Sequence, residues 1–99
     1  MAVDTGASIT VISRDVLQLA GHEPASAERR VTIATVSGLE TVPVVRVGAL
    51  TALGVTRRGI AVLAHTLPPA ARVDGLLGLD FFRDRRLTLD FRLGEITLE

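Results

Sequence analysis

The feature that most constrains this sequence lies at its start, where Val3 leads into the turn Asp4-Thr5-Gly6-Ala7-Ser8. In a turn of this composition the glycine can adopt a positive φ, and the Asp and Thr side chains can accept hydrogen bonds from nearby backbone N–H groups. We therefore expect the carboxylate of Asp4 at the tip of a sharp, rigid loop. Asp-Thr-Gly alone is a weak signal, because many turns between strands use the same residues without doing chemistry.

A second stretch, Leu76-Leu77-Gly78, lies near the other end of the chain and leads into Leu79-Asp80-Phe81-Phe82. In the segment 79–86 acidic residues come first and arginines last, which is the order that a helix dipole favours, so a short helix is predicted there. Asp80 has two interpretations, a second catalytic carboxylate or an acid in the first turn of this helix. Its place beside apolar residues favours the second interpretation.

The two stretches together give the chain a family resemblance. After Asp-Thr-Gly-Ala-Ser comes the β-branched run Ile9-Thr10-Val11-Ile12, and Leu-Leu-Gly follows later. This combination resembles the retropepsin-like aspartic proteases, especially the small single-domain bacterial and retroviral kind. The resemblance implies that Asp4 is the catalytic aspartate. It also implies that the rest of the loop supports Asp4, through Thr5, Gly6, Ala7 and Ser8. The later strand is then expected to pack against the loop through Leu76, Leu77 and Gly78.

A hairpin is predicted between these two stretches. The run 31–36 alternates apolar and small polar residues, Ser37-Gly38 forms a turn, and strand character resumes over 39–42. The resemblance implies that this hairpin is the flap that closes over a peptide substrate, with Gly38 at its tip and Val36, Ser37, Gly38 and Leu39 as substrate-binding residues. The alternative is an ordinary surface hairpin.

Length and composition predict one mostly β domain over residues 1–99. Hydrophobic residues make up 47% of the chain, with three Phe and no Trp or Tyr, so the core must be aliphatic, which favours strands. A short helix is predicted over 13–20, with Ser13 as its N-cap and Gly21 as its end. By the resemblance, the fold class is a retropepsin-like acid protease barrel, closed or partly closed, with one or two short helices.

Composition also limits the chemistry and the partners. The absence of cysteine excludes a thiolate nucleophile and disulfides, and the two isolated histidines show no metal-ligand spacing, so we expect no cofactor. Eleven arginines balance eleven acidic residues, so no net field favours nucleic acid. No apolar run approaches the roughly 18 residues that span a bilayer. The expected location is cytoplasmic by default, with an upstream signal or anchor left open.

The chemistry predicts a symmetric pair of chains. Peptide hydrolysis by water needs one carboxyl to accept a proton and another to donate one, yet each chain supplies a single Asp-Thr-Gly. A two-fold homodimer would bring two copies of Asp4 together. The expected function is therefore an aspartic endopeptidase that acts on peptide or protein substrates as a homodimer. The alternative is a non-catalytic dimerisation or protein-binding module of the same shape.

The start of the chain leads to one further expectation. Only three residues precede Asp4, whereas the family carries a strand or two there. We expect the N-terminal strand or strands to be lacking, so that 9–12 and 76–77 lose a neighbour in the sheet. We also expect this short form to be a poor enzyme that upstream residues would improve.

Overall fold

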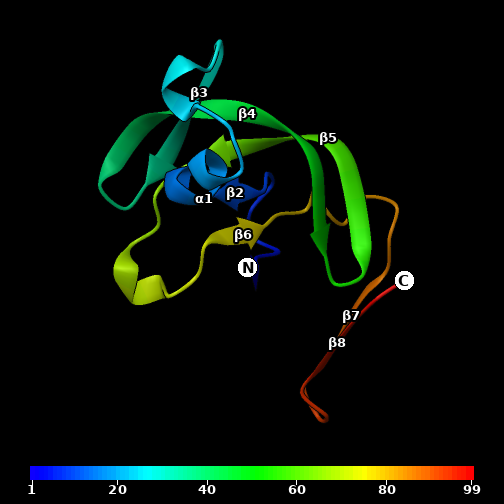
Figure 1. The fold of residues 1–99 in the computed structure, drawn as a ribbon. Coiled ribbons are helices and arrows are strands. Elements are labelled where there is room, and N and C mark those ends of the chain that lie inside the picture. Colours follow the sequence, from blue (N-terminus) through cyan, green and yellow to red (C-terminus); the bar gives the residue numbers. More distant parts are fainter.

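The computed structural model describes residues 1–99 apart from the side chain of Pro69. The chain forms a six-stranded sheet in the order β1-β6-β2-β5-β4-β3 and a separate two-stranded sheet, β7-β8 (Figure 1). The elements are β1 (Ala2–Val3), β2 (Val11–Ile12), α1 (Arg14–Leu19), η1 (Pro24–Ser26), β3 (Arg29–Thr35), β4 (Gly38–Ala52), β5 (Val55–Ala64), η2 (Pro69–Ala71), β6 (Gly75–Leu77), β7 (Leu87–Asp90) and β8 (Glu95–Leu98). The predicted mostly β fold is confirmed, and of the two short helices predicted the structure contains the first, α1. Across the described part of the chain, no helix is long and apolar enough to cross a membrane.

Strand β6 lies between β1 and β2, which are consecutive in the sequence. It runs parallel to β1, with Val3 opposite Leu77, and antiparallel to β2, with Val11 opposite Leu76. The segment that joins β1 to β2 must therefore pass around the end of β6. This topology brings the Asp4 turn and the Leu76-Leu77-Gly78 stretch together.

The expected loss of a sheet neighbour beside β2 and β6 is wrong. Two residues before Asp4 form β1, and β2 and β6 each have a strand on both sides. The short strand suffices because the Asp4 N–H, just beyond it, donates to the Leu77 carbonyl oxygen at 2.9 Å.

Strands β4 and β5 are long and continuous. Gly48 and the segment Arg57-Arg58-Gly59, whose residues locally favour a break or a turn, both lie inside them. The two strands keep one register from Val44↔Leu63 to Ala52↔Val55. Their hairpin turns at Leu53 and Gly54, both with positive φ. The glycines weaken these strands locally, but burial of side chains on one face keeps the strands continuous. The buried side chains are those of Val45, Val47 and Val62.

Two apolar clusters form the core. The first packs α1 onto the sheet through Leu17, which is 2% exposed, together with Ile12 and Val62. The predicted N-cap of α1 is confirmed, since the Ser13 hydroxyl accepts the Val16 N–H at 3.2 Å. The second cluster lies around Phe81 and consists of Val55, Leu77, Phe81 and Phe82. Its location places the turn after β6 firmly against the sheet.

The helix predicted over 79–86 is not present. The segment forms successive turns, with the Phe81 N–H bonded to the Gly78 carbonyl and the Phe82 N–H bonded to the Leu79 carbonyl. Each bond spans three residues, and Asp84 adopts a φ of 60° that ends any helical path. The charge order that suggested a helix is equally compatible with these tight turns.

The close packing of β6 gives a stability prediction. A Cβ on Gly78 would lie 2.6 Å from the backbone carbon of Ile9, so Gly78→Ala must displace backbone and should lower the free energy of unfolding by about 1–3 kcal/mol. Gly48→Ala is the matched control, because nothing lies within 4 Å of its Cβ position. Urea denaturation of both variants measures the difference. Equal stability of the two would contradict the close approach.

Candidate active site

The backbone fixes the carboxylate of Asp4 at the end of β1. Its Oδ1 accepts the Gly6 N–H at 3.0 Å, and its backbone carbonyl accepts the Ala7 N–H at 3.1 Å. The side chain is half-buried, while Thr5 and Gly6 are exposed. The carboxylate therefore has a defined orientation and remains open to solvent on one side.

Gly6 suits this turn because it has no side chain to crowd the Asp4 carboxylate. The sequence suggested a positive φ at this position, but Gly6 does not adopt one. A Cβ there would lie 3.2 Å from Asp4 Oδ1. The glycine thus leaves room for the carboxylate to fold back onto the turn, and its N–H remains free to donate to it.

The segment after β6 holds the far side of the same loop. The Leu79 N–H donates to the Ala7 carbonyl at 2.8 Å, and the Asp80 N–H donates to the Ser8 carbonyl at 3.3 Å. A Cβ on Gly78 would also come within 2.9 Å of the Ala7 carbonyl oxygen. The structure therefore brings Asp4, Ala7 and Ser8 together with Leu77 and Gly78.

A buried polar link joins the end of the Asp4 loop to the turn after β6. Thr10 is fully buried, and its backbone N–H and its hydroxyl both donate to Asp80 Oδ1, at 3.0 and 2.7 Å. The same Asp80 oxygen accepts the Phe81 N–H at 2.8 Å, and Thr10 Oγ1 accepts the Gly78 N–H at 3.1 Å. Asp80 thus links the end of the Asp4 loop to the turn after β6 by hydrogen bonds.

Sequence reasoning missed this link, although Asp80 was interpreted as a structural acid. The available signal was Thr10, a hydroxyl residue inside an otherwise apolar strand run. A buried hydroxyl needs a hydrogen-bond partner, and the nearest unassigned acid beside Gly78 was Asp80.

The remaining predicted site residues lie at the surface. The β3–β4 hairpin turns at Val36 and Ser37, and Gly38, with a φ of 126°, opens β4. Val36 and Leu39 expose 108% and 77% of their surface. Figure 1 shows this hairpin extending from the body of the sheet. Its tip is thus free of packing within the chain, as a moving element would be.

Neither histidine lies with a set of metal ligands. Within the described residues, no group of three His, Cys, Asp or Glu side chains is arranged to hold a metal ion. His65 instead lies 3.6 Å from Glu40 on β4. The chemistry available at the Asp4 turn is that of a carboxylate and of backbone N–H groups.

Removing the Thr10 hydroxyl tests the link to Asp80. Thr10→Val keeps the β-branched shape but leaves the buried Gly78 N–H without its acceptor and removes one of the three hydrogen bonds to Asp80 Oδ1, which should cost about 1–3 kcal/mol of unfolding free energy. Thr88→Val is the control, because Thr88 is exposed on β7. Thermal and urea unfolding measure both variants. A loss at position 10 no greater than at position 88 would contradict a structural role for the link.

The sequence model of a family described as gag-polyprotein putative aspartyl protease matches residues 1–84. Among solved structures, the chain is similar to a retropepsin-like aspartic protease from Rickettsia conorii, with a TM-score of 0.69 and 20% sequence identity. That match covers 89% of this chain and 64% of the other. No curated protein matches the sequence.

The structural similarity concerns the fold, and it agrees with the sheet described above. The family match includes both stretches that meet at the candidate site, the Asp4 turn and the segment from β6 to Asp80. The chain therefore belongs to the family of gag-polyprotein putative aspartyl proteases, with a retropepsin-like fold.

Proposed function

We propose that this protein is an aspartic endopeptidase that hydrolyses peptide bonds as a homodimer, with Asp4 of each chain as the catalytic residue. The observation that carries the proposal is the turn around Asp4. Its carboxylate is oriented by the Gly6 N–H. The turn is also anchored to β6, because the Asp4 N–H donates to the Leu77 carbonyl oxygen. A carboxylate that is fixed yet open to solvent is suited to work on a water molecule.

Two such carboxylates are needed for the reaction. When two carboxyl groups lie close together, repulsion between like charges favours a state in which one is protonated and the other ionised. The ionised group takes a proton from the attacking water, and the protonated group donates to the carbonyl oxygen of the substrate. The carboxyl that took the water proton then donates it to the amide nitrogen, and the other carboxylate takes a proton from a hydroxyl of the gem-diol intermediate. The C–N bond breaks, the amine leaves, and both carboxyl groups return to their starting protonation states. In this scheme Thr5, exposed beside Asp4, supports the paired turns.

The β3–β4 hairpin acts as the flap in this proposal. Its exposed tip, Val36, Ser37, Gly38 and Leu39, offers apolar side chains and strand edges to an extended peptide. The Thr35 hydroxyl accepts the Ser37 N–H at 3.2 Å and donates to the Gly38 carbonyl at 3.0 Å, so the turn keeps its shape while the hairpin moves. Closure would exclude water from the reacting groups.

The β7–β8 hairpin supports association of two chains. It forms its own sheet and projects from the body of the molecule (Figure 1). Four of its apolar side chains are at least 42% exposed: Leu89, Phe91, Leu93 and Ile96. Burial of such side chains against a second copy would remove apolar surface from water. We therefore propose that this hairpin contributes to the dimer.

The catalytic assignment is tested with Asp4→Asn, which preserves the shape of the turn but cannot exchange the proton. Peptide-library cleavage should fall by roughly 10²–10⁴-fold, whereas Asp15→Asn, on the exposed side of α1, should cleave as the unchanged protein does. The assay spans acidic to neutral pH, with and without an aspartic-protease inhibitor. Cleavage by Asp4→Asn at the unchanged rate would refute the assignment. No cleavage by the unchanged protein would favour a binding module.

The dimer is tested with Phe91→Ser, which removes a side chain that is 91% exposed. Sedimentation should show a shift from dimer to monomer, and specific activity should fall in parallel while the far-UV circular dichroism spectrum stays unchanged. Leu19→Ser, at an 89% exposed position on α1, is the matched control and should remain dimeric. A Phe91→Ser protein that stays dimeric would remove the hairpin from the interface.

A further inference from the structure

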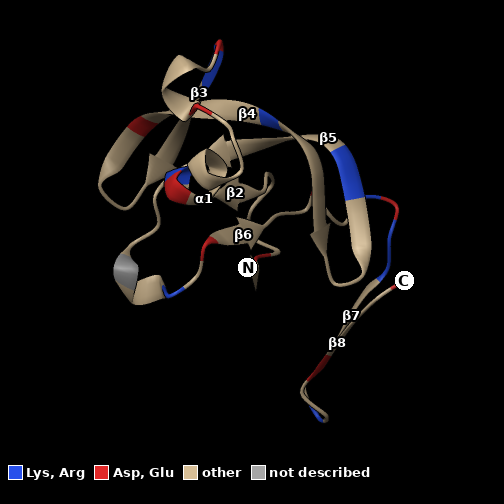
Figure 2. Cartoon of the chain, in the orientation of Figure 1, with Lys and Arg blue, Asp and Glu red and all other residues tan. Residues whose placement is uncertain are grey.

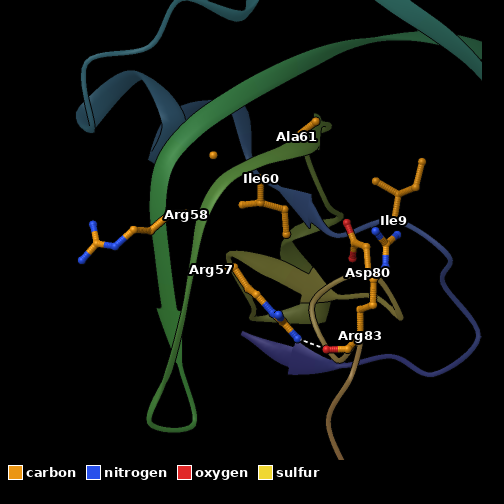
Figure 3. Close-up of a pocket in the computed structure, with 8 residues that line it drawn as sticks. Ile9, Arg57, Arg58, Ile60, Ala61, Asp80 and Arg83 are labelled. Atoms are coloured by element: carbon orange, nitrogen blue, oxygen red, sulfur yellow. Dashed lines mark hydrogen bonds between the residues drawn. The ribbon is translucent and has the colours of Figure 1, made fainter.

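A hollow of about 400 Å³ lies beside the candidate active site and has no role in the mechanism above. It is lined by Ile9, Arg57, Ile60, Ala61, Asp80 and Arg83 (Figure 3). Ile9 is also the residue that ends the Asp4 loop before Thr10. The hollow thus adjoins the segment that carries the catalytic carboxylate.

A second hollow continues the first along the sheet. It measures about 290 Å³ and is lined by Glu28, Arg29, Val44, Arg46 and Ala61. The two hollows share Ala61, which pairs with Arg46 across β4 and β5. Arg46 and Ala61 therefore lie side by side where the two hollows meet. We refer to the combined surface as the basic groove.

The charge of the basic groove is positive. Arg29, Arg46, Arg57 and Arg83 line it, against two acids, Glu28 and Asp80. Arg58 also lines the first hollow, but its side chain points away from the other labelled residues in Figure 3. Basic residues on β4 and β5 are evident in Figure 2.

Two arginines of the basic groove, Arg46 and Arg57, are held in place without being neutralised. Arg57 Nε donates to the Phe81 carbonyl at 2.8 Å, its Nη2 donates to the Arg83 carbonyl, and Arg46 Nη1 donates to the Gly59 carbonyl. Carbonyl acceptors orient a guanidinium but leave its charge and its other N–H donors available. Among the described residues no arginine forms an ion pair with a carboxylate. Asp80, the nearest acid, already accepts three hydrogen bonds on Oδ1.

We propose that the basic groove binds an acidic segment of the polypeptide substrate, at positions away from the scissile bond on the Ile9 side of the catalytic turn. This inference rests on the proposed protease function. Fixed guanidinium groups match carboxylates in charge and in geometry. The walls between them are aliphatic, from Ile9, Ile60 and Ala61, and they carry no aromatic side chain on which a nucleic acid base would stack. An acidic peptide fits this surface better than a nucleic acid does.

Direct binding tests the groove independently of catalysis. The probe is a short fluorescein-labelled peptide rich in glutamate, compared with the same peptide carrying glutamine at those positions, and anisotropy is measured on the Asp4→Asn protein. The glutamate peptide should bind about fivefold or more tightly at low salt, and the difference should shrink near 0.15 M salt. Equal binding of the two peptides would overturn the proposal.

The groove variant is Arg29→Gln combined with Arg83→Gln, since neither side chain makes a hydrogen bond within the described residues. The control is Arg85→Gln combined with Arg86→Gln, which removes the same charge at exposed positions outside both hollows and outside β7 and β8. The groove variant should lose most of the preference for glutamate, and the control should keep it. An equal loss in both variants would mean a general charge effect and would overturn the assignment to the groove. Displacement of the peptide by duplex DNA at equal phosphate and carboxylate concentration would overturn the choice of a peptide ligand.

Cleavage assays separate the two proposals. If the unchanged protein cleaves no peptide but the groove variant loses glutamate binding, the protease proposal fails and the groove remains an acidic-peptide site. If the protein cleaves both peptides equally well and binds them alike, the protease stands and the groove proposal fails.

Discussion

The insertion of β6 between β1 and β2 is the constraint on which the rest of this structure depends. Because the two outer strands are joined by the Asp4 turn, the central strand must approach their backbones closely. Gly75 and Gly78 permit this approach, since a Cβ at either position would meet backbone atoms of 7–12. Backbone hydrogen bonds from Leu77 to Leu79 then hold the turn on both sides. The position of the carboxylate is thus set by the sheet and not by the mobility of a surface loop.

The parts of this arrangement that the sequence predicts are those with local chemical requirements. Asp4-Thr5-Gly6 predicts a turn that holds a carboxylate, Ser13 predicts the start of α1, and the alternating pattern predicts the β3–β4 hairpin. Each of these features is stabilised within a few residues. The closeness of Gly78 to the Asp4 turn came instead from the family resemblance, because no local pattern joins two stretches so far apart.

The errors have a common physical origin in tertiary contacts. Gly48 and Gly59 weaken a strand locally, yet β4 and β5 pass through them because the flanking valines are buried against α1. The segment after Gly78 has a helical charge order, but the carboxylate of Asp80 is occupied by Thr10, which lies on another strand. This contact joins residues 70 apart in the sequence, and its one sign in the sequence is the hydroxyl of Thr10 within an apolar strand run.

The chain exposes two surfaces that a binding partner would stabilise, one apolar and one charged. The β7–β8 hairpin exposes Phe91 and Leu93, whose burial needs an apolar partner surface. The basic groove exposes guanidinium groups whose charge needs carboxylates, and its arginines lie on β3, β4, β5 and the turn after β6. No residue belongs to both surfaces. If association uses the hairpin and substrate selection uses the groove, then assembly depends on apolar area and selection depends on charge. Salt should therefore weaken the preference for acidic substrates while leaving the dimer intact.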